Sequence, residues 1–285
     1  MTLPGFWRSA LDPERIMRIN ITHWSQDDQQ EREDQLAVEE PFEIRINNRP
    51  LAVIMRTPGH DRELALGFLL TEGVIQGAEQ VVTIEDALDA DGLPLPNVLN
   101  VAIPSYQPSA QASFERHFAV SASCGLCGKN SIADLLCSIP PLPPGNMRVP
   151  VSTLYTMANQ LHAEQAVFSH TGGLHAAGLF TKDGRLLLLR EDIGRHNAVD
   201  KLIGYGLLHD IASYRECVLM VSGRTSYEII QKALLAGIPC IAAISAPSSL
   251  AVELAESSGI TLIGFLRGQA MNVYSHPERI MATMP

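Results

Sequence analysis

The stretch CVLMVSGRTSYEIIQKALLAGIPCIAAISAPSSLAVELAESSGITLIGFL, residues 217 to 266, decides the fold. Three apolar runs, CVLMV, CIAAI and ITLIGFL, alternate with two segments that have the composition and length of helices, near 226–236 and 248–257. Strands that alternate with helices in this way predict a mixed sheet with helices on both faces and right-handed crossovers.

The region upstream of this stretch extends the same sheet. A helix is predicted over 154–165 and another near 195–209. Between them, GGLHAAGLF and RLLLLR flank a turn at Lys182-Asp183-Gly184 and are typical of a β-hairpin. We therefore expect an α/β fold (α+β over the whole chain) in which residues 151–285 form the larger domain.

The N-terminal half is less regular. IPPLPPG, at 139–145, has four prolines in seven residues and predicts a stiff linker over 139–150. Before it, AVEEPFEIRINN and RPLAVIMRT predict two strands joined at Asn47-Asn48, and a helix follows that stops at Gly73. We expect a polar arm over 1–35 and a smaller sheet-containing portion over 36–138.

Composition and charge narrow the class of protein. The chain has 285 residues, 46% of them hydrophobic, which is enough to bury a sizeable core. Its net charge of -10 argues against general nucleic-acid binding, and its longest apolar runs are too short to cross a membrane. The five cysteines do not resemble a secreted disulfide scaffold. We expect a soluble cytoplasmic protein with reduced thiols.

Polar residues follow three of the expected strands, just before helices. These segments are EDIGRHN (191–197), SGRTS (222–226) and SAPSS (245–249). Free backbone N–H groups at helix starts favour anions, and the forks of Arg195 and Arg224 suit phosphate oxygens. The alternative is that the segments are ordinary helix caps, with Ser248 as an N-cap and Arg195 at the surface.

Two histidines surround a glycine pair in HTGGLHAAG. The five-residue spacing of His170 and His175 is not that of the H-E-x-x-H zinc motif. Separate structural roles and a shared site both remain open. The glycines indicate a close approach of backbone or ligand.

The stretch SASCGLCGKNS, residues 121 to 131, contains a C-x-x-C pair. A four-cysteine zinc site needs a second such pair, and Cys137, Cys217 and Cys240 are solitary, although zinc shared with distant histidines remains open. The small neighbours favour an accessible loop, and Lys129 and a following helix start would raise the thiolate fraction. From the residues alone, redox chemistry and sulfur transfer are equally favoured.

A family resemblance separates these alternatives. The motifs that carry it run in order from about residue 36 to the end: SCGLCGK, HTGGLHAAGLF, REDIGRHNAVDK, SGRTSYEIIQKALLAGIP, SAPSSLAVELAESSGITLIGFLRG and MNVYSHPERI. Together they resemble the formate dehydrogenase accessory protein family, FdhD. The resemblance implies a C-terminal, three-layer domain of cytidine-deaminase-like fold. It also implies a sulfurtransferase that takes sulfur from a cysteine desulfurase as a persulfide and passes it to the molybdenum cofactor, bis-molybdopterin guanine dinucleotide, for the client formate dehydrogenase.

The resemblance also implies site residues. The persulfide carrier falls on Cys124, with Cys127 as a possible assisting thiol, and no metal site is implied. The cofactor-binding segment is Phe265, Leu266, Arg267, Gly268, Gln269 and Ala270. Members often carry an arginine where this chain has Ala270. Zinc deaminases carry H-x-E and P-C-x-x-C, whereas HAAG has no glutamate and Pro239-Cys240 lacks a second cysteine, which disfavours deamination.

We therefore expect a sulfurtransferase. The rival functions are a non-catalytic cofactor chaperone and, with less support, a thiol-disulfide oxidoreductase. The resemblance does not fix the oligomeric state, for which we consider a homodimer.

Overall fold

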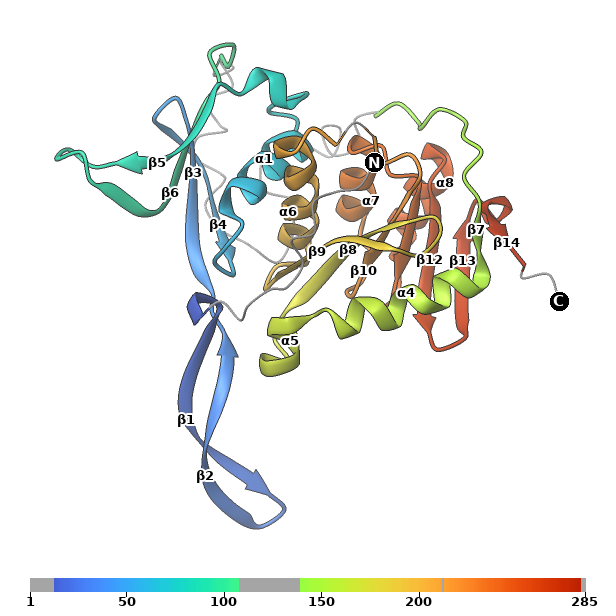
Figure 1. The fold of residues 1–285 in the computed structure, drawn as a ribbon, viewed down its shortest axis with the longest axis horizontal. Coiled ribbons are helices and arrows are strands. Elements are labelled where there is room, and N and C mark those ends of the chain that lie inside the picture. The colour runs from blue at the N-terminus through green and yellow to red at the C-terminus, as the bar shows by residue number, and fades with distance from the viewer. Residues whose placement is uncertain (1–12, 108–138, 212, 283–285) are drawn as a thin grey trace.

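A six-stranded mixed sheet forms the centre of the molecule in the computed structural model, which describes residues 13–107, 139–211 and 213–282. Its strand order is β13-β12-β11-β10-β8-β9 (Figure 1). The strands are β8 (His175–Thr181), β9 (Leu186–Asp192), β10 (Cys217–Val221), β11 (Cys240–Ala243), β12 (Thr261–Arg267) and β13 (Ala270–Ser275). β10, β11 and β12 run parallel, and β8 and β13 run antiparallel to their neighbours, so the predicted mixed sheet is confirmed.

Helices cover both faces of this sheet, as the alternation predicts. One face packs against α6 (Arg195–Leu208), α7 (Tyr227–Leu235) and α8 (Ser249–Ser258), and the other against α4 (Val151–Ala163). Neighbouring residues of one strand serve opposite cores: Leu219 faces the three-helix side and Met220 the α4 side. A short helix, α5 (Ala166–Thr171), follows α4.

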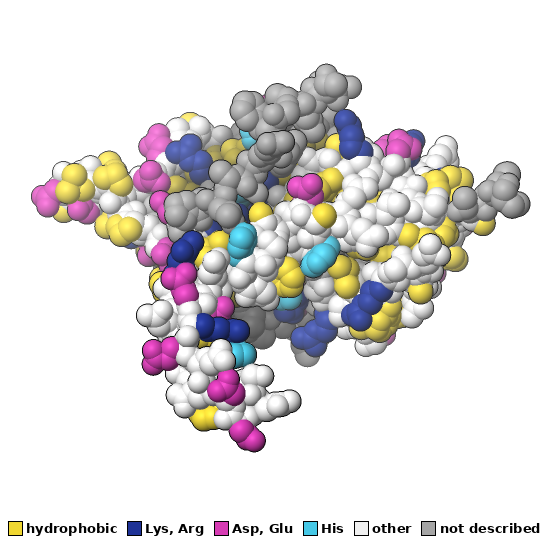
Figure 2. Space-filling model, turned by 60° about the horizontal axis from the view of Figure 1, so that its bottom comes forward, with side chains coloured by type: hydrophobic (Ala, Val, Ile, Leu, Met, Phe, Trp, Pro, Cys, Tyr) yellow, Lys and Arg dark blue, Asp and Glu magenta, His cyan; other side chains and the backbone are white. Residues whose placement is uncertain are grey.

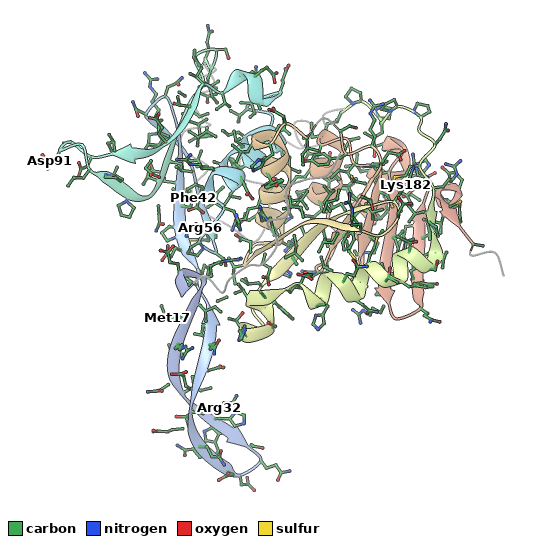
Figure 3. All side chains as sticks on the ribbon, viewed as in Figure 1. Met17, Arg32, Phe42, Arg56, Asp91 and Lys182 are labelled. Atoms are coloured by element: carbon green, nitrogen blue, oxygen red, sulfur yellow. The ribbon has the colours of Figure 1, made fainter. Side chains whose placement is uncertain are left out.

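A second sheet, of four strands in the order β4-β3-β6-β5, lies beside the first. It consists of β3 (Glu40–Ile46), β4 (Arg49–Arg56), β5 (Thr83–Leu88) and β6 (Pro94–Ala102). The predicted turn joins β3 to β4 at Asn47 and Asn48, both with positive φ, which suits a tight hairpin. Phe42 and Arg56 lie together in this sheet, with the Arg56 guanidinium carbon 5.5 Å from the ring centroid (Figure 3).

Helix α1 (Asp61–Thr71) connects the two sheets by packing along α6. The two backbones touch at glycines: a Cβ at Gly67 would overlap the carbonyl group of Asp200, and one at Gly204 would overlap that of Glu63. Since only glycine permits this approach, the pair fixes where the helices cross. The predicted stop at Gly73 is also present, because its positive φ follows the last turn of α1.

The described part of the polar arm forms a two-stranded ribbon that projects from the molecule (Figure 1). β1 (Ile16–Ser25) and β2 (Asp28–Ala37) pair antiparallel, and Met17 and Arg32 mark their course in Figure 3. Acidic side chains gather on this ribbon, and acidic and hydrophobic ones gather on the tip of the β5–β6 hairpin (Figure 2). The ribbon's regular pairing was not apparent in its run of charged and amide residues.

The proline-rich segment runs past α8 and leads to β7, beside the β13 edge of the six-stranded sheet (Figure 1). Leu142 donates its N–H to the carbonyl of Ser258, and β7 (Val149–Pro150) pairs with β14 (Ile280–Met281). The remaining elements are single 3-10 turns at Pro13–Arg15, Ala78–Gln80 and Pro277–Arg279. The division of the chain into domains at 139–150 stays a prediction.

Candidate functional site at the strand-end edge

One edge of the six-stranded sheet collects all three of the predicted helix-start segments. We call it the strand-end edge: the carboxyl ends of β9, β10, β11 and β12 with the amino ends of β8 and β13. Backbone hydrogen bonds hold two of the segments, 222–226 and 245–249, together there. Thr225 donates its N–H to the carbonyl of Ala246, and Ser248 donates to the carbonyl of Thr225.

Arg195, the first residue of α6, lies at this edge beside His175 of β8. Both contact the same glycine: a Cβ at Gly223 would lie 3.2 Å from Nδ1 of His175 and 3.5 Å from Cδ of Arg195. Burial lowers the pKa of His175, and the positive charges of Arg195 and Arg224 lower it further, against an opposing effect of Asp192. The imidazole is therefore neutral at neutral pH, and the positive charge here belongs to the arginines.

Two buried polar atoms at the edge have no hydrogen-bond partner in the described part of the chain. They are Nε of Arg195 and Oγ1 of Thr225, whose residue is 1% exposed. Buried polar atoms are almost always paired, so an unpaired donor and an unpaired hydroxyl at the same edge are typical of a site that a ligand completes.

His196 lines the same edge from the first turn of α6. Its Nε2 lies 3.2 Å from Oγ of Ser226, the N-cap of α7, and 3.9 Å from a carboxylate oxygen of Glu228. Burial, together with the charges of Arg195 and Lys232, lowers the pKa of His196 to about 3. His196 is therefore neutral at physiological pH and acts as a hydrogen-bonding group. His170, in contrast, is exposed on α5.

Residues 265–270 form the irregular turn from β12 to β13. Phe265 and Gly268 have positive φ, and the strand pairing is bulged between Gly264 and Arg267. A bulky residue in this region of φ is strained, and such strain is concentrated at functional sites. Phe265 is 42% exposed and its N–H donates to the carbonyl of Ser245.

The other residues of this turn differ in what they offer a ligand. Nε of Arg267 donates to the carbonyl of Ile244 at 3.0 Å, which fixes the guanidinium beside the end of β11. Leu266 is fully buried in the core on the α4 side, so its side chain serves packing. Gly268, Gln269 and Ala270 are exposed.

Most of the segment 190–201 has a role that sequence reasoning missed: it fastens the four-stranded sheet to the six-stranded one. Asp192 pairs with Lys201 at 2.7 Å, and both are fully buried. Thr57, which follows β4, bonds to both residues. Arg190 forms a bidentate pair with Glu63 of α1. Arg195 and His196 are the residues of this motif whose side chains we assign to the strand-end edge.

The five cysteines fall into two groups. Cys124, Cys127 and Cys137 lie outside the described residues, so their surroundings remain a matter of prediction. Cys217 and Cys240 are buried, and burial raises their pKa to about 11 and about 12. Both therefore stay protonated thiols and serve packing in the two hydrophobic cores.

Two cavities of the described structure lie elsewhere, against the four-stranded sheet. One, of about 450 Å³, is lined by His60, Asn97 and Leu208 among others, and the second, of about 650 Å³, by Asn48, Glu85 and Asn100 among others. Neither includes residues of the strand-end edge. Within the described ranges, no helix has the length and apolarity to cross a membrane.

Comparison with known proteins gives a consistent result. The profile of the FdhD/NarQ family matches residues 37–281. The chain is 49% identical over 267 residues to the sulfur carrier protein FdhD of Mycobacterium tuberculosis, covering 91% of this chain and 96% of that one. It is 50% identical over 252 residues to the protein of the same name from Nocardia farcinica, covering 87% and 89%.

A solved structure has the same fold. The crystal structure of a protein from Desulfotalea psychrophila, described as a formate dehydrogenase accessory protein, superposes with a TM-score of 0.72 at 26% identity. The match covers 93% of this chain and 99% of the other.

Proposed function

Because this chain belongs to the FdhD/NarQ family, we propose that it is a cytoplasmic sulfurtransferase that serves formate dehydrogenase. It takes sulfur from a cysteine desulfurase and relays it to bis-molybdopterin guanine dinucleotide, which is its substrate. The C-terminal part, 151–285, has the cytidine-deaminase-like arrangement, and the smaller N-terminal portion carries the C-x-x-C pair. The relatives' name, sulfur carrier protein, supports this assignment.

Cys124 is the sulfur carrier in this proposal. Its thiolate attacks the terminal sulfur of the desulfurase persulfide, so that a new S–S bond forms on Cys124 while the bond to the donor cysteine breaks. The donor leaves as a thiolate, and no outside oxidant or reductant is needed. The positive charge of Lys129 and the helix start that the sequence predicts after it would favour the attacking thiolate. Cys127 assists.

The strand-end edge is the binding place for the cofactor. The observation that carries this assignment is that Nε of Arg195 and the buried hydroxyl of Thr225, both at this edge, have no hydrogen-bond partner in the described part of the chain. Phosphate oxygens accept from both groups, and Arg224 and Arg267 add positive charge. The exposed ring of Phe265 offers a surface for a guanine or pterin ring. Gly268 allows the cofactor to approach the backbone.

Mass spectrometry tests the relay. The protein is incubated with a cysteine desulfurase and cysteine, and we expect Cys124 to gain the mass of one sulfur atom. An unmodified protein would favour the rival function, a non-catalytic cofactor chaperone. Loss of two hydrogens across Cys124 and Cys127 would instead indicate thiol-disulfide chemistry.

Complementation tests the biological role. In cells that lack the natural protein, Cys124→Ala should fold and bind nucleotide but fail to activate formate dehydrogenase. Cys127→Ala should be milder if that thiol only assists, and equally severe if sulfur passes between the two. Cys217→Ala, at a buried thiol, is the matched control and should retain activation. Full activation by Cys124→Ala would replace the relay with the chaperone.

A further inference from the structure

Thr57 links the four-stranded sheet to the strand-end edge through every polar group it has. It follows β4 directly, is fully buried, and lies outside any regular element. Its N–H donates to Oδ2 of Asp192 at 3.2 Å, and its Oγ1 accepts from the N–H of Ile193 at 3.2 Å. Its carbonyl accepts from Nζ of Lys201 at 2.8 Å.

Two of these bonds reach the turn of the chain at residues 192–195, which leads into α6, and the third comes from Lys201 within α6. The same turn is tied from within, because Oδ1 of Asp192 accepts from the N–H of Gly194 at 2.8 Å and from Nδ2 of Asn197 at 2.9 Å. Arg195 is the next residue, so the direction of its side chain depends on the conformation of this turn. The hydroxyl of Thr57 is the group from outside that fixes the turn at Ile193.

We propose that Thr57 is a positioning residue for phosphate binding: its hydroxyl sets the turn that holds the Arg195 guanidinium at the strand-end edge. The inference rests on the proposed function, since it assumes that Arg195 meets a phosphate there. Charge-assisted hydrogen bonds depend on the distance and angle between donor and acceptor. A site therefore loses affinity for its ligand when the donor group is slightly displaced. Thr57 therefore acts through Arg195, without touching the ligand.

Calorimetry with guanosine diphosphate and with guanosine, on the full chain, tests this. Thr57→Val keeps the shape of the side chain but removes the acceptor of Ile193. We expect it to weaken guanosine diphosphate binding roughly tenfold, which corresponds to about 1.4 kcal/mol, and to leave guanosine binding unchanged. Thr57→Ser, which restores the hydroxyl, should recover most of the affinity.

A double-mutant cycle with Arg195→Gln separates positioning from general damage. If Thr57 acts through Arg195, Thr57→Val/Arg195→Gln should bind guanosine diphosphate no more weakly than Arg195→Gln alone. The matched control is Thr71→Val, which removes another buried hydroxyl, at the end of α1, bonded to Asp200 of α6 and Lys232 of α7. It should lower the unfolding temperature and leave the nucleotide affinity unchanged.

Three results would overturn the inference. Independent, multiplying losses in the double variant would mean that Thr57 does not act through Arg195. Equal losses for guanosine and guanosine diphosphate in Thr57→Val would mean a general structural effect. If the unchanged protein binds guanosine and its diphosphate equally and Arg195→Gln has no effect, the phosphate site of the proposed function fails as well. Either of the first two results would overturn the role of Thr57 alone and leave that site intact.

Discussion

Arg190 and Glu63 form a bidentate ion pair that joins β9 to α1, with Nε–Oε2 at 2.5 Å and Nη2–Oε1 at 2.8 Å. Both side chains are at most 10% exposed. Burial by itself would raise the pKa of Glu63, but the hydrogen bonds and charge of Arg190, with help from His60, hold it below its usual value. The carboxylate therefore stays ionised and the pair intact through the physiological range.

Breaking this pair should be costly. Glu63→Ala leaves the buried Arg190 guanidinium without its carboxylate partner, and we expect a loss of about 3–5 kcal/mol in the free energy of unfolding. Urea denaturation measures it. Glu33→Ala, which breaks the exposed pair with Arg18, is the control and should cost about 1 kcal/mol or less. Equal losses in the two variants would contradict a buried, paired Glu63.

The glycine contact between α1 and α6 predicts that alanine at Gly67 destabilises the protein, the opposite of its usual effect in a helix. Alanine in place of an open helical glycine stabilises a protein by up to about 1 kcal/mol. At Gly67 the added methyl group would overlap backbone atoms of Asp200, which cannot move without displacing α6. We expect Gly67→Ala to destabilise by roughly 3 kcal/mol, as measured by thermal unfolding. Gly145→Ala, where no atom lies within 4 Å of the new Cβ, should change the stability little. A stabilised Gly67→Ala would show that the helices do not touch there.

The local patterns were sufficient to predict the C-terminal sheet. The run around Leu219 and Met220 alternates between two cores. The N-cap at Ser248, which was the alternative to a ligand role for that segment, is present, its Oγ accepting from the N–H of Ala251. Each of these features depends on residues close in sequence. The same holds for the turn at Asn47-Asn48.

The junction between the sheets could not be predicted, because its partners are far apart in the chain. Arg190 and Glu63 are 127 positions apart, and Lys201 and Thr57 are 144 apart. Charged residues after a strand are typical of ligand sites, which is how the motif around Asp192 was interpreted, and nothing local reveals that they are buried against another element. The glycines Gly67 and Gly204, both inside helices, were the local sequence feature that indicated close packing between α1 and α6.

The charges at the strand-end edge predict a measurable coupling between two side chains. Arg195 lowers the pKa of His175, second only to burial as a cause. Arg195→Gln removes that positive charge, so the pKa of His175 should rise, as followed by NMR titration of its ring protons. Asp192 and Arg224, which also influence His175, are unchanged in this variant. Arg185→Gln, at the exposed turn between β8 and β9, is the control and should leave the titration of His175 unchanged. An unshifted pKa in Arg195→Gln would mean that the guanidinium does not lie beside the ring.

His196 predicts how stability depends on pH. Its pKa is about 3 in the folded protein, because of burial first and then the charges of Arg195 and Lys232, and about 6.5 in an unfolded chain. Between these values the unfolded state binds a proton that the folded state excludes, so stability is full above pH 6.5 and falls as the pH is lowered. A single such group contributes at most about 1.4 kcal/mol per pH unit.

Urea denaturation of the unchanged protein at several pH values from 7 to 5 measures this slope. His196→Gln cannot take up a proton, and its stability should fall less steeply with acid over that range, whatever its absolute value. His170→Gln, at an exposed histidine on α5, should keep the slope of the unchanged protein. A His196→Gln variant with an unaltered slope would mean that this imidazole is free to protonate in the folded state. Its place as a neutral, buried hydrogen-bonding group at the strand-end edge would then be wrong.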